Sequence, residues 1–305
     1  MLKSHRFEVF LFFGALTFAF NGVISKLVLE AGLSTWRLTE IRCSGAFVIM
    51  LAVVMVRKAK SLLIKRDELP LLISFGVIGI AAVQVFYFVA IARLHVSISL
   101  IIEFTAPIWI ALWLRFVMKK EVSKLMWWGL SLGFVGLMMV AQVWKGLTLN
   151  GIGVIAAFID AFALAGYFLL GERLGKKKDS DVMMVWGLGV ASVLFAIAFP
   201  WWTYPFHIFT QKMDLHGRFA GQMWPGWTLI LWVVVMGTIV PYFCVISGLK
   251  GLSAAKSSVI GMLEPILAGV FGWWWLNEAF TGIQLVGAFV VLVGIYLADR
   301  AKTAS

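Results

Sequence analysis

Ten long apolar runs, separated by short polar connections, occupy almost the whole chain. Each is close in length to the roughly 20 helical residues that cross a bilayer core of about 30 Å. The runs cover residues 7–29, 36–56, 69–92, 97–117, 124–143, 150–171, 182–203, 227–249, 254–276 and 281–298. Of the 305 residues, 62% are hydrophobic and 13% charged, whereas a soluble domain has about 45–50% apolar and about 25% charged residues. The sequence therefore predicts an all-α integral membrane protein with ten transmembrane helices.

The positive charges are distributed unevenly between the two sides of these runs. If the N-terminus is inside, nineteen Lys and Arg residues fall on the inner side and five on the outer side. Cytoplasmic loops of membrane proteins carry such an excess. We therefore expect a multi-pass protein of the plasma membrane with both termini in the cytoplasm. Because the net charge of +11 follows from this bias, nucleic acid is not an expected partner.

Landmark residues recur at a fixed separation along the chain. Three pairs are 158 positions apart: Pro107 and Pro265, Gly129 and Gly287, and Gly136 and Gly294. Helices one to five thus correspond to helices six to ten, and we expect one five-helix repeat in residues 1–148 and the other in residues 149–305. Since five is odd, the second repeat enters from the opposite face, so the repeats are inverted. Secondary transporters commonly have this arrangement, with two halves rocking about a central site.

The repeated unit resembles the EamA family of the drug/metabolite transporter superfamily. Phe18–Lys26 is similar to the family's Trp-Gly…Lys segment, with Phe where Trp is usual, and Glu40-Ile41-Arg42 resembles its Leu-Arg-Phe stretch. The family's Glu-Pro-Leu and Leu-Gly-Glu patterns look like residues 264–266 and 276–278, with Asn277 replacing Gly, and residues 105–107 with 120–121 match more loosely. The resemblance covers essentially the whole chain. It implies a plasma-membrane exporter or carrier of amino acids or related metabolites.

Polar groups at membrane depth are the candidate site residues. A charge at the bilayer centre costs about 2.5–3.5 kcal/mol even on the lenient insertion scale, so such residues are kept for a reason. The candidates for substrate binding or coupling are Glu264, Glu103, Arg42, Asp160, Asn21, Gln84, Tyr87, Trp109 and Tyr242. Three prolines are expected to kink their helices, because proline has no backbone N–H: Pro107, Pro241 and Pro265.

Glu264 is the first choice among these candidates. It precedes Pro265, and a kink there leaves carbonyls free to face a cavity. A carboxyl removed from water could also carry a proton. Pairing with a buried cation is the structural alternative, as it is for Glu103 with Arg42 or Lys26.

Arg42 could hold a substrate carboxylate, because its planar guanidinium matches that shape. A local network with Glu40 is the alternative. An internal acid suits a cationic or zwitterionic ligand, and Arg42 suits an anionic group. Together they favour a zwitterion, so amino acids and their derivatives are the expected substrates. Packing is the alternative role for the aromatic candidates Tyr87, Trp109 and Tyr242.

The sequence thus predicts a secondary transporter that exports amino acids or related metabolites by alternating access. Proton antiport, proton symport and facilitated diffusion all stay open. There is no phosphate-binding Gly-x-x-x-x-Gly-Lys-Ser/Thr loop and no His-Glu-x-x-His or Gly-x-Ser-x-Gly motif. We therefore expect no enzyme, cofactor or metal. The alternative is an intramembrane enzyme acting on a lipid or small metabolite, with Asp160 and Glu264 as its acids. A monomer is the default, a dimer stays open, and residues 203–226 are expected to form a surface loop or a gate.

Overall fold

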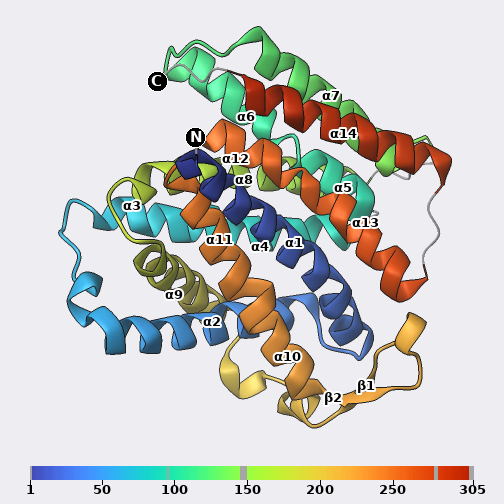
Figure 1. The fold of residues 1–305 in the computed structure, drawn as a ribbon. Helices are drawn as coiled ribbons and strands as arrows, with labels where there is room; N and C mark the ends of the chain where they lie inside the picture. The colour runs from blue at the N-terminus through green and yellow to red at the C-terminus, as the bar shows by residue number, and fades with distance from the viewer. Residues whose placement is uncertain (1, 95, 145–149, 278–280, 302–305) are drawn as a thin grey trace.

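The structure is a computed structural model that describes residues 2–94, 96–144, 150–277 and 281–301. Figure 1 shows a bundle of helices with one small sheet at its edge. Six crossings are single helices: α1 (Leu2–Glu30), α2 (Thr35–Lys58), α7 (Lys124–Val140), α8 (Gly151–Gly175), α9 (Ser180–Ala198) and α14 (Gly282–Arg300). In the described part of the chain, nine crossings are long and apolar enough to span a membrane, and α7, with 17 residues, is a shorter apolar helix. The predicted class, an all-α membrane protein of ten helices, is confirmed. The expected boundary between the repeats, at residues 148 and 149, lies outside the described residues.

Four crossings are built from shorter pieces. The third consists of α3 (Leu69–Ser74), the π-helical turns η2 (Phe75–Ala82) and α4 (Val83–Ile91), and the fourth of α5 (Val96–Glu103), α6 (Ala106–Leu112) and the π-helical η3 (Trp113–Val117). The eighth consists of α10 (Gly226–Val234), the π-helical η7 (Val235–Ile239) and α11 (Val240–Leu249), and the ninth of α12 (Ala254–Gly261) and α13 (Leu263–Leu276). Pro107 and Pro265 each lie in the first turn of the piece that follows a break, and Pro241 lies in the first turn of α11, directly after the π-helical η7.

The connection after α9 contains structure that the sequence analysis did not predict. α9 ends at Ala198, earlier than the predicted run to residue 203, because Phe199 precedes a proline and takes a non-helical conformation. Short 3₁₀ turns follow, η4 (Trp201–Thr203), η5 (Phe206–Phe209) and η6 (Gly217–Phe219); a further one, η1 (Ala59–Leu62), follows α2. Strands β1 (Lys212–Asp214) and β2 (Met223–Pro225) pair antiparallel within this connection, with Met213 opposite Trp224.

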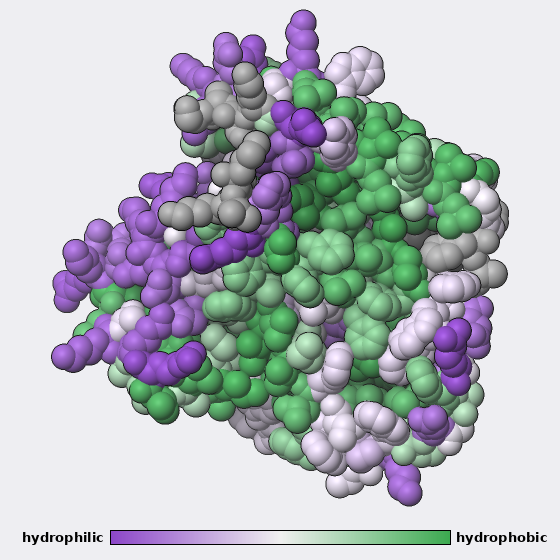
Figure 2. Space-filling view, in the orientation of Figure 1, coloured by the Kyte–Doolittle hydropathy of each residue, from purple (hydrophilic) through white to green (hydrophobic). Residues whose placement is uncertain are grey.

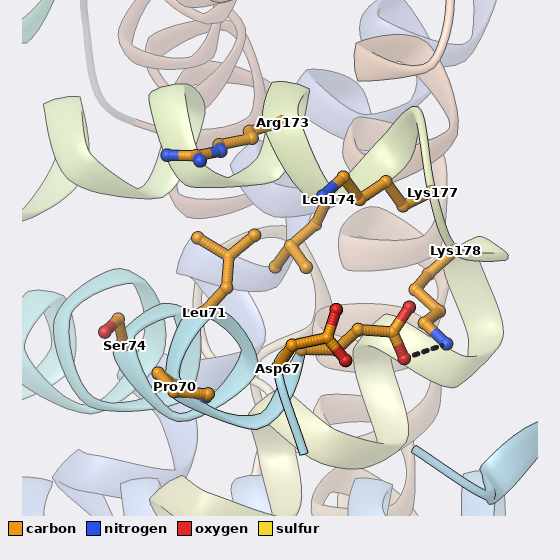
Figure 3. Close-up of a pocket in the computed structure, with 9 residues that line it drawn as sticks. Asp67, Pro70, Leu71, Ser74, Arg173, Leu174, Lys177 and Lys178 are labelled. Carbon is orange, nitrogen blue, oxygen red and sulfur yellow. Dashed lines mark ion pairs between the residues drawn. The ribbon is translucent and has the colours of Figure 1, made fainter. Parts of the chain in front are cut away.

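Alternate connections meet at one end of the bundle, which we call the basic end. Asp179, in the turn between α8 and α9, accepts hydrogen bonds from Lys58 at 2.8 Å and Lys250 at 3.3 Å. Lys178 forms an ion pair of 2.6 Å with Glu68, which precedes α3 (Figure 3). Hydrophilic side chains gather over this region at the upper left of Figure 2, whereas most of the visible face is apolar. The assignment of this end to the cytoplasm stays a prediction of the charge bias.

Helices α7 and α14 lie side by side at one edge of the bundle (Figure 1). Four glycines allow this close approach. A Cβ atom added at Gly129 would lie 2.7 Å from the carbonyl oxygen of Gly294, and one added at Gly136 would lie 2.7 Å from that of Gly287. The contacts join Gly129 to Gly294 and Gly136 to Gly287. The separation of 158 positions instead relates Gly129 to Gly287 and Gly136 to Gly294, so the partners are exchanged. Such an exchange is the contact pattern that a two-fold relation between the fifth and tenth helices produces.

Candidate functional site

Five of the predicted site side chains are buried inside the bundle. Asn21, Arg42, Gln84, Asp160 and Tyr242 are each at most 8% exposed, and they come from α1, α2, α4, α8 and α11. The other four, Tyr87, Glu103, Trp109 and Glu264, are half-buried. Both halves of the chain therefore contribute polar groups to the interior.

Arg42 is held by the π-helical turn η7. Its Nε donates a hydrogen bond of 3.1 Å to the Thr238 hydroxyl, and its Nη2 donates one of 3.1 Å to the carbonyl oxygen of Gly237. Thr238 in turn donates to the carbonyl oxygen of Val233 at 2.8 Å. Among the described residues, Arg42 forms no ion pair within 4.0 Å, and both of its hydrogen-bond acceptors are neutral. A buried charge without a counter-ion is costly, which makes Arg42 a candidate ligand for an anionic group.

The acceptor for Arg42 lies in an irregular turn of the eighth crossing. Gly237 belongs to the π-helical η7, and its carbonyl oxygen accepts from Arg42. Pro241 lies just beyond this turn, in the first turn of α11. Neither Gly237 nor Thr238 was predicted as a site residue. The signal that could have revealed them is Pro241, which marks a nearby irregularity in the helix.

Asn21 packs directly on this same turn. A side chain at position 237 would overlap the Oδ1 atom of Asn21, so the close contact between α1 and η7 requires glycine there. Asn21 Oδ1 is buried and has no hydrogen-bond partner among the described residues. Asn21 and Arg42 thus approach η7 from two helices of the first half.

Three carboxyl groups are linked electrostatically through Glu103. Glu103 is the last residue of α5 and Glu264 the second of α13, so both lie beside breaks in their helices. Glu103 interacts electrostatically with Glu264 and with Asp160 of α8, and Glu264 interacts with Arg42. Tyr87 lies within range of all four. The structure therefore brings three acids and one base from four crossings, and Tyr87 from a fifth, to a common centre.

Several polar atoms around this centre have no partner in the described part of the chain. Buried and unpaired are Glu103 Oε2, Asp160 Oδ1, Asn21 Oδ1 and the Tyr167 hydroxyl. Buried polar groups in proteins are nearly always hydrogen-bonded, so a cluster of unpaired ones calls for an explanation such as a ligand, water or a proton.

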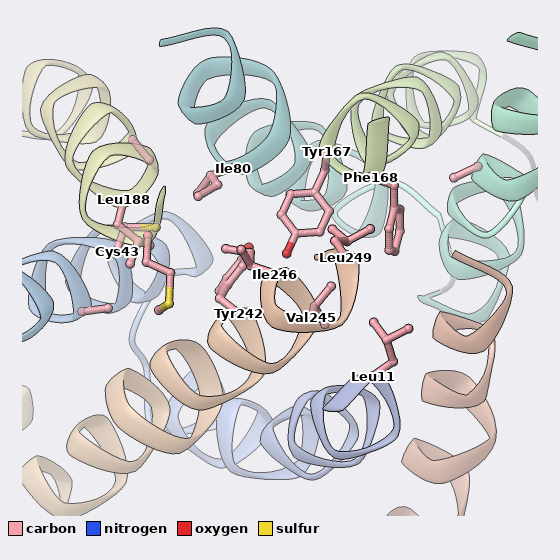
Figure 4. Close-up of a cluster of buried hydrophobic side chains, with 14 of the residues drawn as sticks. Leu11, Cys43, Ile80, Tyr167, Phe168, Leu188, Tyr242, Val245, Ile246 and Leu249 are labelled. Atoms are coloured by element: carbon pink, nitrogen blue, oxygen red, sulfur yellow. The ribbon is translucent and has the colours of Figure 1, made fainter. Parts of the chain in front are cut away.

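Aromatic side chains of α8 and α11 pack against each other beside these polar groups. Gln84 donates a hydrogen bond of 3.2 Å to the Tyr242 hydroxyl, and these two residues are themselves 158 positions apart. The Tyr242 ring meets those of Phe18 and Tyr167 edge-on, at centroid distances of 5.3 and 5.9 Å. Figure 4 shows Tyr167 and Tyr242 facing each other between α8 and α11.

The surroundings of Trp109 and the partner of Glu40 differ from those considered in the sequence analysis. Trp109 donates to the Thr105 hydroxyl at 3.0 Å and packs on Phe162, whose side chain is 52% exposed. Trp109 is therefore half-buried between the core and the exposed Phe162. Glu40 pairs with Arg37 at 2.6 Å instead of with Arg42. Arg37 also donates to the carbonyl oxygen of Phe199, which ties α2 to the connection after α9.

The remaining ionisable groups do not suggest a metal centre. Within residues 2–94, 96–144, 150–277 and 281–301, no group of three or more His, Cys, Asp or Glu side chains is placed to hold a metal ion. Lys26 is exposed, as expected for a side chain that reaches toward the membrane surface.

Comparison with known proteins finds a family whose sequence model matches this chain. Residues 6–142 and residues 151–298 each match the sequence model of the EamA-like transporter family. The uncharacterized inner membrane transporter YicL of Salmonella typhimurium is 20% identical over 294 residues, covering 93% of both chains.

Two further relatives are named as transporters. The threonine/homoserine exporter RhtA of Salmonella typhimurium is 25% identical over 232 residues, covering 75% of this chain and 70% of that one. An uncharacterized transporter of Archaeoglobus fulgidus is 23% identical over 214 residues, covering 70% and 71%. A solved crystal structure aligns over 96% of both chains with a TM-score of 0.75 at 16% identity, which shows that its fold is shared.

Proposed function

This chain belongs to the EamA-like transporter family, and on that premise we propose that it exports amino acids or related small metabolites by alternating access, coupled to protons. Its relatives are transporters, and one is named as an exporter of threonine and homoserine. The two repeats, residues 1–148 and 149–305, are the bodies that rock about the central site. One chain holds groups from both repeats, so a monomer suffices.

The observation that carries the substrate class is Arg42. Its guanidinium is buried, forms no ion pair within the described residues, and is held in place by η7. A substrate carboxylate supplies the missing counter-ion in a geometry that guanidinium favours. The ammonium group of the same substrate then faces Glu264, which lies within electrostatic range of Arg42. An α-amino acid has both charges on one small frame.

The three carboxyls give a reason for proton coupling. With Glu103, Asp160 and Glu264 all ionised, one guanidinium would face three negative charges inside the membrane. Such a cluster is stable only when protons or a cationic group neutralise part of it. A proton and a substrate ammonium group compete for the same carboxylate. Alternation between them exchanges protons for substrate, which is antiport.

The experiment is efflux and counterflow of labelled amino acids in sealed proteoliposomes, with and without an imposed pH gradient. We expect saturable movement that responds to the gradient. Each substrate is compared with its decarboxylated amine. In wild type the amine is transported at least about tenfold less well, because hydrogen bonds to a charged group contribute about 1.5–3 kcal/mol. In Arg42→Gln the two compounds become similar.

Two further variants separate binding from coupling. Arg42→Lys keeps the charge but not the planar fork, so it should retain weak preference for the amino acid. Glu264→Gln should abolish the response to the pH gradient while counterflow persists. The substrate assignment fails if wild type moves the amine as well as the acid. Covalent conversion of the solute would instead support the intramembrane enzyme with Asp160 and Glu264 as acids.

A further inference from the structure

A pocket lies at the basic end, away from the polar centre. Its volume is about 260 Å³, and it lies between the start of α3 and the end of α8. Leu71 and Leu174 form its apolar middle. Figure 3 shows the basic residues Arg173 and Lys177 on one side of this middle and Asp67 on the other. The pocket is therefore dipolar, with a cationic rim and an anionic rim.

Only some of the charged side chains that line the pocket are paired within the protein. Lys178 and Glu68, which also line the pocket, neutralise each other in an ion pair of 2.6 Å. The Lys178 hydrogen bond holds the pKa of Glu68 below its ordinary value, so this pair stays charged and paired at neutral pH. Arg173, Lys177 and Asp67 form no ion pair within 4.0 Å with any described residue. Two cations and one carboxylate therefore remain for a ligand.

Exposed apolar side chains alternate in the chain with the pocket-lining residues of the third crossing. Leu69, Ile73 and Val77 follow one another at intervals of four residues, and each is 37–41% exposed. Side chains at this spacing lie on one face of a helix. Ser74, which lines the pocket, lies between Ile73 and Val77 in the chain. The same helix segment therefore offers exposed apolar surface near the pocket, which the hydrocarbon chains of an amphiphilic ligand can cover and which a free phosphate cannot use.

We propose that this pocket binds the headgroup of a phospholipid that carries both a phosphate and a primary amine, as phosphatidylethanolamine does. Arg173 and Lys177 hold the phosphate, since guanidinium and ammonium groups both bind phosphate oxygens. Asp67 accepts hydrogen bonds from the lipid's ammonium group. Phosphatidylcholine has no N–H to donate to Asp67, and phosphatidylglycerol has no amine. Basic pockets between transmembrane helices are known to bind lipid headgroups.

The test is lipid retention by the full-length protein. The protein is equilibrated in nanodiscs with equal amounts of phosphatidylethanolamine, phosphatidylglycerol and phosphatidylcholine, and the lipids that stay bound are counted by native mass spectrometry. Wild type should retain phosphatidylethanolamine about tenfold over the other two, which corresponds to about 1.4 kcal/mol. Asp67→Asn should remove the preference over phosphatidylcholine. Arg173→Gln with Lys177→Gln should remove retention of all three.

The matched control is Arg57→Gln with Lys60→Gln, which removes two exposed positive charges near the same end but outside the pocket. It should retain phosphatidylethanolamine like wild type, and melting temperatures show whether each variant is folded. Inorganic phosphate at millimolar concentration should not displace the lipid; if it does, the site takes phosphate alone and the proposal is wrong. Equal retention of the three lipids by wild type, or equal loss in the control, also overturns it.

Discussion

Replacement of Gly136 by alanine tests the contact between α7 and α14. The new Cβ would lie 2.7 Å from the carbonyl oxygen of Gly287 and 2.7 Å from the backbone nitrogen of Val291, about 0.7 Å closer than ordinary contact. Both neighbours are backbone atoms that cannot rotate away, so the helices must separate. Overpacking of this kind costs about 1–3 kcal/mol, while alanine regains up to about 1 kcal/mol over glycine in a helix. The net loss of about 1–2 kcal/mol corresponds to a fall in melting temperature of about 2–5 °C.

The assay is thermal unfolding of the purified protein in detergent, with Gly22→Ala as the matched control. Gly22 also lies inside a helix, but an added Cβ would have no atom within 4 Å, so its melting temperature should stay or rise slightly. Gly287→Ala strains the same crossing, so the double variant with Gly136→Ala should lose less than the sum of the two. If Gly136→Ala melts like the control, or the two losses add fully, the close glycine contact is not present.

The remaining predictions concern the polar centre and the basic end. Gly237→Ala should reduce transport several-fold, because its side chain overlaps Asn21, and Asn21→Ala in the same chain should restore part of the rate in the counterflow assay. At the basic end, the hydrogen bonds from Lys58 and Lys250 hold the pKa of Asp179 below its ordinary value. Their stabilisation is therefore complete above about pH 4 and is lost as the pH falls further. Asp179→Asn should flatten the fall in melting temperature between pH 5 and pH 3 by an amount equivalent to about 1 kcal/mol or less, because Asp179 is more than half exposed; an unchanged pH profile would contradict this.

The ten helices were predictable because lipid imposes a length and an apolar composition on every crossing. The breaks at Pro107 and Pro265 were also predictable, because a missing N–H interrupts the helix wherever proline lies. The short sheet after α9 was not predicted. Its strands have three residues each, too few for an alternating pattern to appear in the sequence.

Pairings across the bundle could not be predicted in the same way. Because Glu40 and Arg42 are only two residues apart in the sequence, an ion pair between them is an obvious expectation. On a helix, however, such residues point in different directions, whereas Arg37 and Glu40 share a face and pair. Trp109 looked like a cavity residue by type, but its direction depends on the rotation of α6 within the bundle. That rotation is set by packing, which the sequence of one helix does not encode.

The short length of α7 has a consequence for the surrounding bilayer. Seventeen residues at 1.5 Å each span only about 25 Å, against a hydrocarbon core of about 30 Å. Exposed tryptophans, Trp128 near its start and Trp144 just beyond its end, are suited to anchoring both ends of this helix at the lipid headgroups. The membrane must therefore thin by a few ångströms along the edge formed by α7 and α14. Lipids with shorter acyl chains relieve that deformation, so acyl-chain length should affect this side of the protein more than any other.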